Sequence, residues 1–447
     1  MNQALAEKDH YLSIFERCDQ RGAGPAWVQP LRQDAISRFA VLGFPTTKDE
    51  EWKYTNVSPI LQFPFRPAPP ETEGSAAIAA VERATAIGLP LHRLVFVNGH
   101  YAPRLSSVQG LRGRVRASSL RDAFAEAPDS LKAHLARYAD HKTHAFVALN
   151  TAFMEEGAYL YVPKGAIVEE PVLFLFLSIG SAAAAVSYPR NLIVAGQGSQ
   201  VTVVEAYLGS PGAVYLTNGV TEIAAGEDAV VDHYKLVEES DAAFHVATQQ
   251  ARLERSANFV SHLILLGGAL VRNDVNAVLE GEGIECTLNG LFMATDRQHV
   301  DSHTRIDHVR PHGCSRELYK GILSGGARGV FNGKIYVHKS APKTDAKQTN
   351  KNLLLSEEAL VDTKPQLEIY NNDVKCTHGS TIGQLDQDAL FYLRARGIGL
   401  AEARNLLTYA FASEIIRGIK VASIRDQLDR MVRTRLENQF RAKERGS

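Results

Sequence analysis

The residue types best suited to chemistry lie in one short stretch near the end of the chain, DVKCTHG at residues 373–379. In a strand, Cys376 and His378 would point to the same face, because side chains alternate along a strand with a period of two. A thiolate beside an imidazole is half of a zinc or iron site, and it is also the pairing used by cysteine nucleophiles. The plainer interpretation, which the pattern alone favours, is a buried cysteine next to a histidine that caps the turn at Gly379. If the pair does bind a metal, a second protein must supply the remaining ligands.

A second group of possible ligands lies upstream. It comprises His299, His303, His308, His312 and Cys314, separated by 4, 5, 4 and 2 residues. Histidines four residues apart on a helix would form a metal-binding face. The surrounding sequence predicts strands and turns instead, and there we do not expect this spacing to align the side chains in one column. We therefore interpret the group as polar residues lining turns.

A glycine-rich stretch, GGARGVFNGK at residues 325–334, does not match the motif of a phosphate-binding loop. It lacks the four-residue gap between glycines, and Lys334 is followed by Ile335 rather than by serine or threonine. We expect no ATP site in this chain.

The elements that must position these residues are mainly strands. From about residue 159 the chain consists of short β-branched runs separated by small turn residues, with little helical periodicity. Turn residues recur at steps of 28, 30 and 27 (Gly198, Gly226, Ser256, Gly283) and then of 15, 15 and 14 (Gln298, Gly313, Ala327). A repeat near 28 with a half-repeat near 15 is typical of stacked coils of paired strands. We predict a parallel β-helix, or β-solenoid, over residues 151–383, with an irregular antiparallel β domain as the alternative.

Two pairs of residues are expected to interact with neighbouring coils of such a repeat. Cys286 and Cys314 are 28 residues apart, about one coil, so we expect them to stack as packed thiols rather than as a disulfide. Asn350 and Asn352 would suit side-chain ladders between coils that satisfy buried polar groups of the turns.

Helical patterns flank the β segment. Residues 1–150 are predicted to be a mixed α/β region, with a helix from Pro30 to Gly43 and a strand that enters a turn at Asn98-Gly99. Residues 384–447 are predicted to be a docking domain of three helices, the first capped by Asp386 and ended by Gly397. In the second helix we expect a stripe of Leu406, Ala410 and Ile415. The tail aromatics stand at core spacing: Phe391, Tyr392, Tyr409 and Phe411.

The composition excludes several classes of protein. With 49 basic and 50 acidic residues the net charge is -1, which gives no whole-protein field for nucleic acid or an anionic membrane. Four cysteines in 447 residues exclude a disulfide scaffold and, without C-x-x-C spacing, a self-contained metal site of the usual kind. The chain start lacks a secretory pattern. The uncharged run from Pro171 to Pro189 is interpreted as a buried strand pair joined by a turn rather than a membrane span, and we expect a cytoplasmic protein.

Three stretches resemble the SufB/SufD family of scaffold proteins of the SUF iron–sulfur cluster assembly system. They are DEEWKYTNV at 49–57, the long stretch 328–386 that contains KSAPKTDAKQTNKNLLLS and NNDVKCTHGS, and LFYLRARGI at 390–398. Their order along the chain also matches. The first stretch and the chain length favour the SufD branch over its paralogue SufB.

The resemblance implies a right-handed parallel β-helix with helical flanking regions, which agrees with the repeat. It implies a non-catalytic scaffold that pairs with SufB through the β-helix and binds the SufC ATPase through the C-terminal helices, and it is compatible with a homodimer of the isolated chain. A transient iron–sulfur cluster would be shared with SufB, with His378 as the implied ligand and Cys376 beside it. The sequence departs from the family pattern in two places. Asn371 and Asn372 occupy positions where acidic residues are expected, which argues against a carboxylate role there. Neither Cys286 nor Cys314 matches the sulfur-receiving cysteine of SufB, so persulfide chemistry is expected in the partner.

Two other functions compete with this one. A β-helix carbohydrate lyase or hydrolase would need clustered Asp or Glu along one face, usually with calcium, and a secretion signal; the sequence has neither. An RNA-associated adaptor would use the tail 384–447, which has twelve Lys/Arg against eight Asp/Glu, and its RNA retention would depend steeply on salt.

Overall fold

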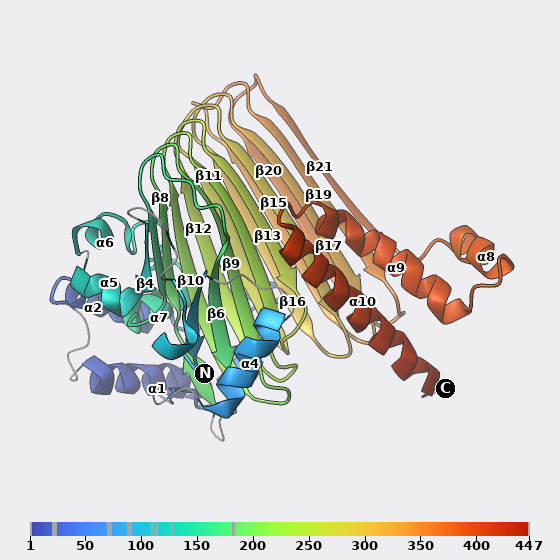
Figure 1. Cartoon of the computed structure of the whole chain (residues 1–447), viewed down its shortest axis with the longest axis horizontal. Helices are drawn as coiled ribbons and strands as arrows, with labels where there is room; N and C mark the ends of the chain where they lie inside the picture. The colour runs from blue at the N-terminus through green and yellow to red at the C-terminus, as the bar shows by residue number, and fades with distance from the viewer. Residues whose placement is uncertain are drawn as a thin grey trace.

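The structure is a computed structural model that describes residues 2–19, 25–68, 74–86, 92–108, 111, 115–126, 128–180 and 184–445. Two facing sheets, built largely of parallel strands, form a β-solenoid of about eight turns, with helices packed on its outer faces (Figure 1). The predicted architecture, a solenoid core with a mixed α/β N-terminal region and C-terminal helices, is confirmed.

One sheet has eleven strands and the other has ten. The eleven-stranded sheet contains β1 (Arg66–Pro67), β4 (Arg116–Ser119), β5 (Ala158–Val162), β7 (Ala185–Ser187), β8 (Arg190–Ala195), β10 (Tyr215–Ala225), β12 (Phe244–Leu253), β14 (Leu270–Leu279), β16 (His299–His308), β18 (Arg328–Val337) and β20 (Leu360–Ile369). The ten-stranded sheet contains β2 (His92–Val97), β3 (His100–Tyr101), β6 (Val172–Ser178), β9 (Gln200–Gly209), β11 (Val230–Glu238), β13 (Asn258–Leu265), β15 (Glu285–Ala294), β17 (Cys314–Leu323), β19 (Asp345–Leu354) and β21 (Lys375–Gly383).

The repeat in the sequence is the length of one coil. Leu216 of β10 pairs with Phe244 of β12, and Leu270 of β14 pairs with His299 of β16. The turns need left-handed backbone at one residue each, which Gly198 (φ 63°) and Gly283 (φ 66°) adopt freely. Of the two turns between them, one has the predicted Ser256 in this conformation (φ 56°), and in the other the left-handed residue is Asp228 (φ 57°) rather than Gly226. The turn spacing therefore located these coils to within two residues.

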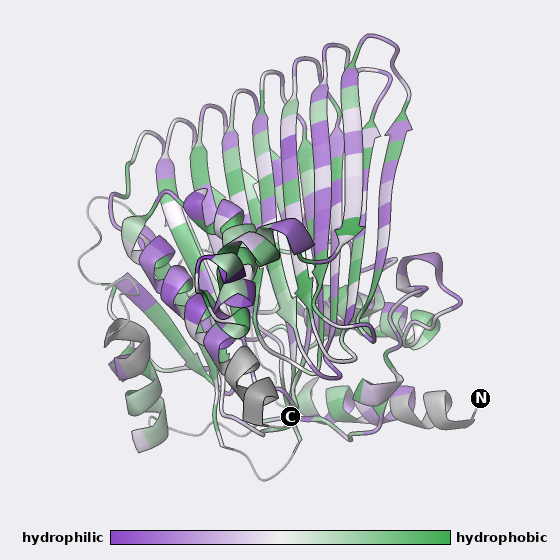
Figure 2. Ribbon diagram, turned by 90° about the vertical axis from the view of Figure 1, so that its right-hand side faces the viewer, coloured by the Kyte–Doolittle hydropathy of each residue, from purple (hydrophilic) through white to green (hydrophobic). Residues whose placement is uncertain are grey.

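The solenoid interior is mostly apolar and continuous from coil to coil. Alternate residues of each strand point inward, as in the column Val231, Phe259 and Cys286 of neighbouring strands. This alternation of hydrophobic and hydrophilic residues is visible along the strands in Figure 2. Asn350 and Asn352 lie in a strand rather than a turn; Asn350 Nδ2 donates to the Tyr319 carbonyl of the adjacent coil at 3.2 Å.

The helices precede and follow the β segment, with a few inside the N-terminal region. They are α1 (Asn2–Asp19), α2 (Gln29–Leu42), α3 (Ser58–Leu61), α4 (Ser75–Ala86), α5 (Leu120–Glu126), α6 (Pro128–His134), α7 (Ala145–Ala152), α8 (Gln387–Ala395), α9 (Leu400–Arg417) and α10 (Ala422–Arg445), with 3-10 turns at Glu50–Trp52 and Pro103–Leu105. α1, α2 and α7 pack on the outer face of the eleven-stranded sheet. α4, α9 and α10 pack on the outer face of the ten-stranded sheet.

The uncharged run from Pro171 to Pro189 forms two strands, β6 and β7, as expected. They belong to opposite sheets instead of pairing with each other, because the chain crosses the solenoid between them. Ser181, the last residue of the turn expected at Ser178–Ser181, lies outside the described residues. Across the described part of the chain, no helix is long and apolar enough to cross a membrane.

Candidate interfacial ligand site

The last coil leaves one end of the solenoid open. Among the described residues, β20 pairs with β18 alone and β21 with β19 alone, so each strand is the edge of its sheet. Large apolar side chains are exposed on or next to these edges: Leu360, Ile369, Tyr370 and Ile382. Unpaired strand edges with exposed apolar groups favour association with another chain.

Cys376 and His378 lie on the edge strand β21, on the same face. Their register partners in β19 are Ala346 and Gln348, both inward-facing and buried. Cys376 packs against the apolar cluster around Ile335 and Val337, and this burial raises the pKa of its thiol. His378 is exposed. The strand prediction therefore placed the pair correctly, but only the imidazole stands free at the open end.

A polar column lies beneath His378 inside the solenoid. Glu317 of β17 is the register partner of Gln348, and Gln348 is the partner of His378. Gln348 Nε2 donates to Glu317 Oε2 at 2.8 Å, and the Thr304 hydroxyl donates to Glu317 Oε1 at 2.5 Å. Burial raises the pKa of Glu317 to about 7, although the two hydrogen bonds act to lower it.

The upstream histidines do not form one group. His299 and His303 share the outer face of β16, because four residues are two full strand repeats, while His308 points into the solenoid toward Ser315 (2.9 Å). His312 lies in the following turn, at φ 61°. The expectation that these residues line turns is wrong for the three strand histidines. In the part of the chain that the structure describes, no three His, Cys, Asp or Glu residues are arranged to hold a metal ion.

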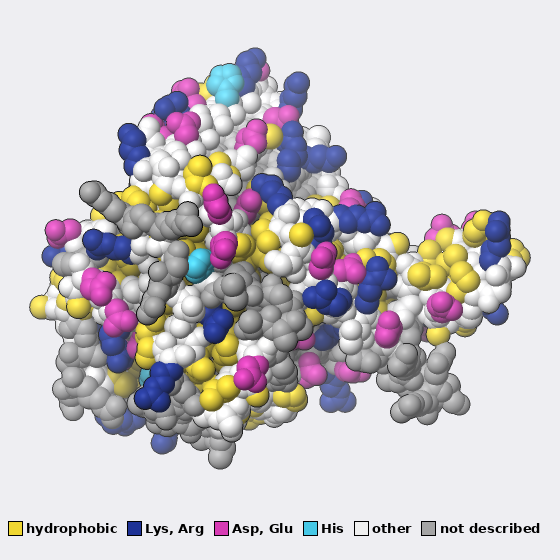
Figure 3. All heavy atoms as spheres, viewed as in Figure 1, with side chains coloured by type: hydrophobic (Ala, Val, Ile, Leu, Met, Phe, Trp, Pro, Cys, Tyr) yellow, Lys and Arg dark blue, Asp and Glu magenta, His cyan; other side chains and the backbone are white. Residues whose placement is uncertain are grey.

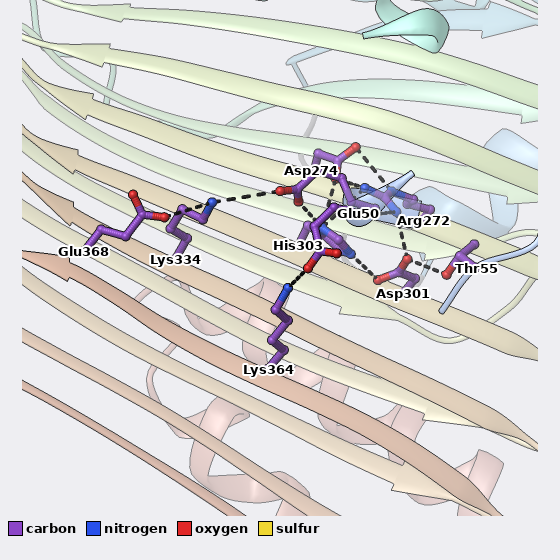
Figure 4. Close-up of polar contacts among 10 residues, drawn as sticks. Glu50, Thr55, Arg272, Asp274, Asp301, His303, Lys334, Lys364 and Glu368 are labelled. Atoms are coloured by element: carbon purple, nitrogen blue, oxygen red, sulfur yellow. Dashed lines mark hydrogen bonds and ion pairs between the residues drawn. The ribbon is translucent and has the colours of Figure 1, made fainter. Parts of the chain in front are cut away.

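His303 belongs to an ion-pair cluster (Figure 4). Asp301 contacts His303 Nε2 at 3.0 Å and Arg272 Nη1 at 3.1 Å, and it accepts a hydrogen bond from Thr55 at 2.5 Å. The Arg272 guanidinium lies over the Trp52 ring, 3.8 Å from its centroid. The cluster thus fixes residues 51–55 of the N-terminal region to the outer face of β14 and β16.

The charged groups of this cluster shift the pKa values of its carboxyl groups. A hydrogen bond from His303 lowers the pKa of Glu51 to about 2. Burial opposes ionisation of Asp301, but the charges of His303 and Arg272 hold its pKa well below the usual range. These acidic and basic groups are paired with each other, so they form a structural anchor.

Cys286 and Cys314 are adjacent in space but do not stack. The partner of Cys286 is Ser315 and the partner of Cys314 is Glu285, so the cysteines are out of register by one residue and occupy opposite faces. None of the four cysteines forms a disulfide within the described part of the chain. Burial raises the pKa of Cys286, which leaves it a neutral core residue.

The C-terminal helices present an exposed apolar surface. Phe391 and Tyr392 on α8 are 74% and 57% exposed, and Leu400 and Leu406 on α9 are 46% and 43% exposed. Figure 3 shows this hydrophobic surface on α8, which projects away from the solenoid. The prediction that these tail aromatics are core residues is wrong for Phe391 and Tyr392.

α9 is buried along a different stripe from the one predicted. Of the predicted stripe, Ile415 is buried as expected, whereas Leu406 and Ala410 are exposed; Ala412 and Ile416 face the sheet with Ile415. Lys320 of β17 donates to the Phe411 carbonyl at 2.8 Å and ion-pairs with Glu414. The exposed surface and the last coils are therefore joined through one helix.

Comparison with known proteins assigns the family. Residues 177–411 match the family described as SUF system FeS cluster assembly, SufBD core domain, and residues 6–174 match the SufBD protein N-terminal region. The chain belongs to the SufBD family. It is 33% identical to an iron–sulfur cluster assembly SufBD family protein of Synechocystis sp., over 90% of both chains. It is also 33% identical to the iron–sulfur cluster assembly protein SufD of Escherichia coli, over 89% of this chain and 91% of that one.

A third relative has the same printed function. SufD of Bacillus subtilis is 27% identical over 95% of this chain and 97% of its own length. This SufBD chain is therefore a SufD-like protein of the SUF iron–sulfur cluster assembly system. The structure brings two of its predicted site residues, Cys376 and His378, onto one strand at the open end of the solenoid.

Sequence patterns missed two groups of residues in this SufBD chain. Glu317 and Gln348 are 31 residues apart, and nothing local distinguishes them; the coil length of about 30 would have placed them in one column. The ion-pair cluster joins Thr55 to Asp301 across 246 residues. Its only sequence signal was the acidic and aromatic stretch at 49–57.

Proposed function

We propose that this chain is a SufD scaffold subunit that pairs with SufB at the open end of its solenoid and lends His378 to a shared iron–sulfur cluster assembly site. The observation that carries the proposal is the exposed imidazole of His378 on β21, the edge strand of a SufBD-family solenoid, which among the described residues is paired on one side only. The cluster is the cargo of the assembly system. It is held transiently, so the chain acts as a scaffold rather than as an enzyme.

The chemistry of the residues fits a shared site. A neutral imidazole is a good ligand for iron, and His378 has free access from the open end. Cys376 is a weaker candidate, because burial raises its thiol pKa and a metal ligand must be the thiolate. One or two ligands from this chain leave the other positions to SufB, whose approach would bury the cluster and whose withdrawal would release it.

The open end supplies the pairing surface. A second solenoid placed on this end would cover two strand edges. It would also remove four exposed apolar side chains from water: Leu360, Ile369, Tyr370 and Ile382. The same surface is available to a second copy of this chain when SufB is absent.

The exposed apolar surface of α8 and α9 is the proposed docking site for the SufC ATPase. It lies on the helices that follow the last strand, and it is joined to β17 through Lys320 and Glu414. ATP would be bound and hydrolysed by SufC. Cysteines that form no disulfide among the described residues fit a reducing compartment such as the cytoplasm.

A pull-down with tagged chain, SufB and SufC tests the two surfaces against each other. Ile382→Lys places a charge at the open end, and we expect it to weaken SufB retention by about tenfold or more, corresponding to about 1.4 kcal/mol, while SufC binding persists. A double Phe391→Asp, Tyr392→Asp variant should lose SufC and keep SufB. Val41 on α2 is 77% exposed, and Val41→Lys serves as the control that keeps both partners. Loss of both partners in either surface variant, or of neither, contradicts the proposal.

A further inference from the structure

Glu317, Gln348 and His378 form a continuous column through the last three coils. They are successive register partners on β17, β19 and β21 and point to the same side of their strands. Glu317 is 3% exposed and Gln348 is 1% exposed. Exposure increases only at His378, where the column reaches the open end of the solenoid.

The hydrogen bonds in this column run in one direction. Both oxygens of Glu317 accept: one from the Thr304 hydroxyl at 2.5 Å, the other from Gln348 Nε2 at 2.8 Å. The nitrogen of the Gln348 amide thus faces Glu317. The orientation of the Gln348 amide is therefore set by the carboxylate below it.

The remaining atom of this amide has no partner. Gln348 Oε1 is buried and accepts no hydrogen bond from any described residue. Leaving a buried acceptor unsatisfied costs free energy. In a stack of amides the nitrogen and oxygen point to opposite neighbours along the stack. Because Nε2 is bonded to Glu317, Oε1 is the atom of this amide that remains for a donor from the next coil, where the register partner of Gln348 is His378.

We propose that Gln348 is the positioning residue for His378. When the exposed ring turns toward Gln348, the unpartnered Oε1 accepts a hydrogen bond from one N–H of the imidazole, which orients the ring and leaves the other nitrogen unprotonated and facing the open end. Histidines that bind metals commonly donate their second ring N–H to such an acceptor. The role of the free nitrogen as a ligand rests on the proposed function, whereas the hydrogen bond itself does not.

The chain offers a matched control. Asn352, also on β19, is 3% exposed and has a buried Oδ1 without a partner among the described residues. Its register partner on β21 is Ile382, which has no side-chain donor. Replacing either amide by an isosteric apolar side chain removes one unsatisfied acceptor, but only Gln348 can affect His378.

The test is the tautomer of His378, measured in the full-length chain labelled with ¹⁵N-histidine by long-range proton–nitrogen correlation. The His378 signals are identified as those lost in His378→Gln. We expect one dominant tautomer in the unsubstituted chain, a shift toward a mixture in Gln348→Met, and no change in Asn352→Leu. The signals of the buried His233 and His262 report whether each variant is folded.

Three results would overturn the proposal. They are a mixture of tautomers already present in the unsubstituted chain, an unchanged tautomer in folded Gln348→Met, and an equal shift in Asn352→Leu. The first needs no variant, so the test holds even if Gln348→Met does not fold. Because the measurement involves no cluster, a failure of cluster assembly by His378 would contradict the proposed function without changing this result.

Discussion

Glu222, on the outer face of β10, joins the solenoid to the N-terminal region through a single carboxylate. It accepts hydrogen bonds from the backbone N–H groups of Ala136 (2.6 Å), Tyr138 (2.7 Å) and Ala139 (2.9 Å), and from Arg190 Nη2 (2.7 Å). The side chains of Glu222 and Arg190 are both fully buried. Four donors balance this buried charge, and its removal would leave Arg190 without an anion.

We expect Glu222→Gln to lower the free energy of unfolding by about 3 kcal/mol, because it leaves a buried guanidinium unpaired. Glu227→Gln is the matched control, since Glu227 pairs with Arg255 at the surface (3.1 Å) and exposed pairs contribute about 1 kcal/mol or less. Urea denaturation of the two variants measures the difference. Equal losses would show that the buried pair is not the anchor described.

For single residues, the sequence was sufficient to predict which side chains share a face of one strand. It was not sufficient to predict the pairing register between neighbouring strands. Cys376 and His378 are two residues apart in one strand, so their shared face follows from the strand period alone. Cys286 and Cys314 are on different strands 28 residues apart, whereas the coil at this point is 29 residues long, which pairs Cys286 with Ser315. A single residue in a turn reverses a face, and no pattern within the strands records it.

The turn between α9 and α10 is the element that holds the C-terminal helices on the solenoid. Lys420 ion-pairs with Asp232 at 3.0 Å, and its backbone N–H donates to the Tyr234 hydroxyl at 3.4 Å. His262 lies beneath this turn, stacked on Tyr234 with 5.3 Å between ring centroids, and it is 1% exposed. Burial lowers the pKa of His262 to about 4, and the nearby charges of Lys420 and His233 act in the same direction.

This shift predicts that acid weakens the docking of α9 and α10. The unfolded chain binds a proton at His262 near pH 6.5, whereas the folded chain does so only near 4. The stabilisation is therefore complete above pH 6.5 and is lost as the pH falls toward 4, by about 2 kcal/mol at pH 5. Hydrogen exchange of peptides from α9 and α10, corrected for intrinsic rates, should show less protection at pH 5 than at pH 7.

The same experiment in His262→Gln separates this residue from the others. The variant should lose most of the pH dependence in these helices. His308→Gln is the control, because burial also lowers the pKa of His308 to about 4 but His308 lies inside the solenoid. An unchanged pH dependence in His262→Gln would show that another group controls the docking.

Helix ends were predictable, whereas helix faces were not. Asp386 caps α8 by accepting from the N–H groups of Asp388 and Ala389, and Gly397 follows the helix at φ 85°; both signals are local. The buried stripe of α9 depends on how the helix lies on the ten-stranded sheet: Ile415 and Ile416 pack on that sheet, whereas Leu406 is exposed. For the last helix, the spacing predicts a stripe of Ile424, Leu428, Met431, Leu436 and Phe440. The first four are buried or half-buried, and the side chain of Phe440 lies outside the described residues.

The whole molecule has two different ends. Strands and helices of the N-terminal region pack around the first coils, while the last coil ends in two edge strands with exposed apolar groups. The repeat length predicted the solenoid, because each coil contacts only its neighbours and a constant period is sufficient to define it. The attachment of residues 51–55 to β14 and β16 could not be predicted, because it depends on contacts across more than 200 residues.

The central claim is that this asymmetric scaffold completes a shared site with His378. The most direct measurement is anaerobic reconstitution of the complex with SufB and SufC, using iron and sulfide, with the visible absorption of the cluster recorded for the unsubstituted chain, for His378→Ala and for His144→Ala. His144 is an exposed histidine at the start of α7, far from the open end, and its side chain makes no capping hydrogen bond. We predict that all three complexes elute intact and that only His378→Ala loses cluster absorption, by about tenfold or more. An intact His378→Ala complex that forms the cluster in normal yield would contradict the account.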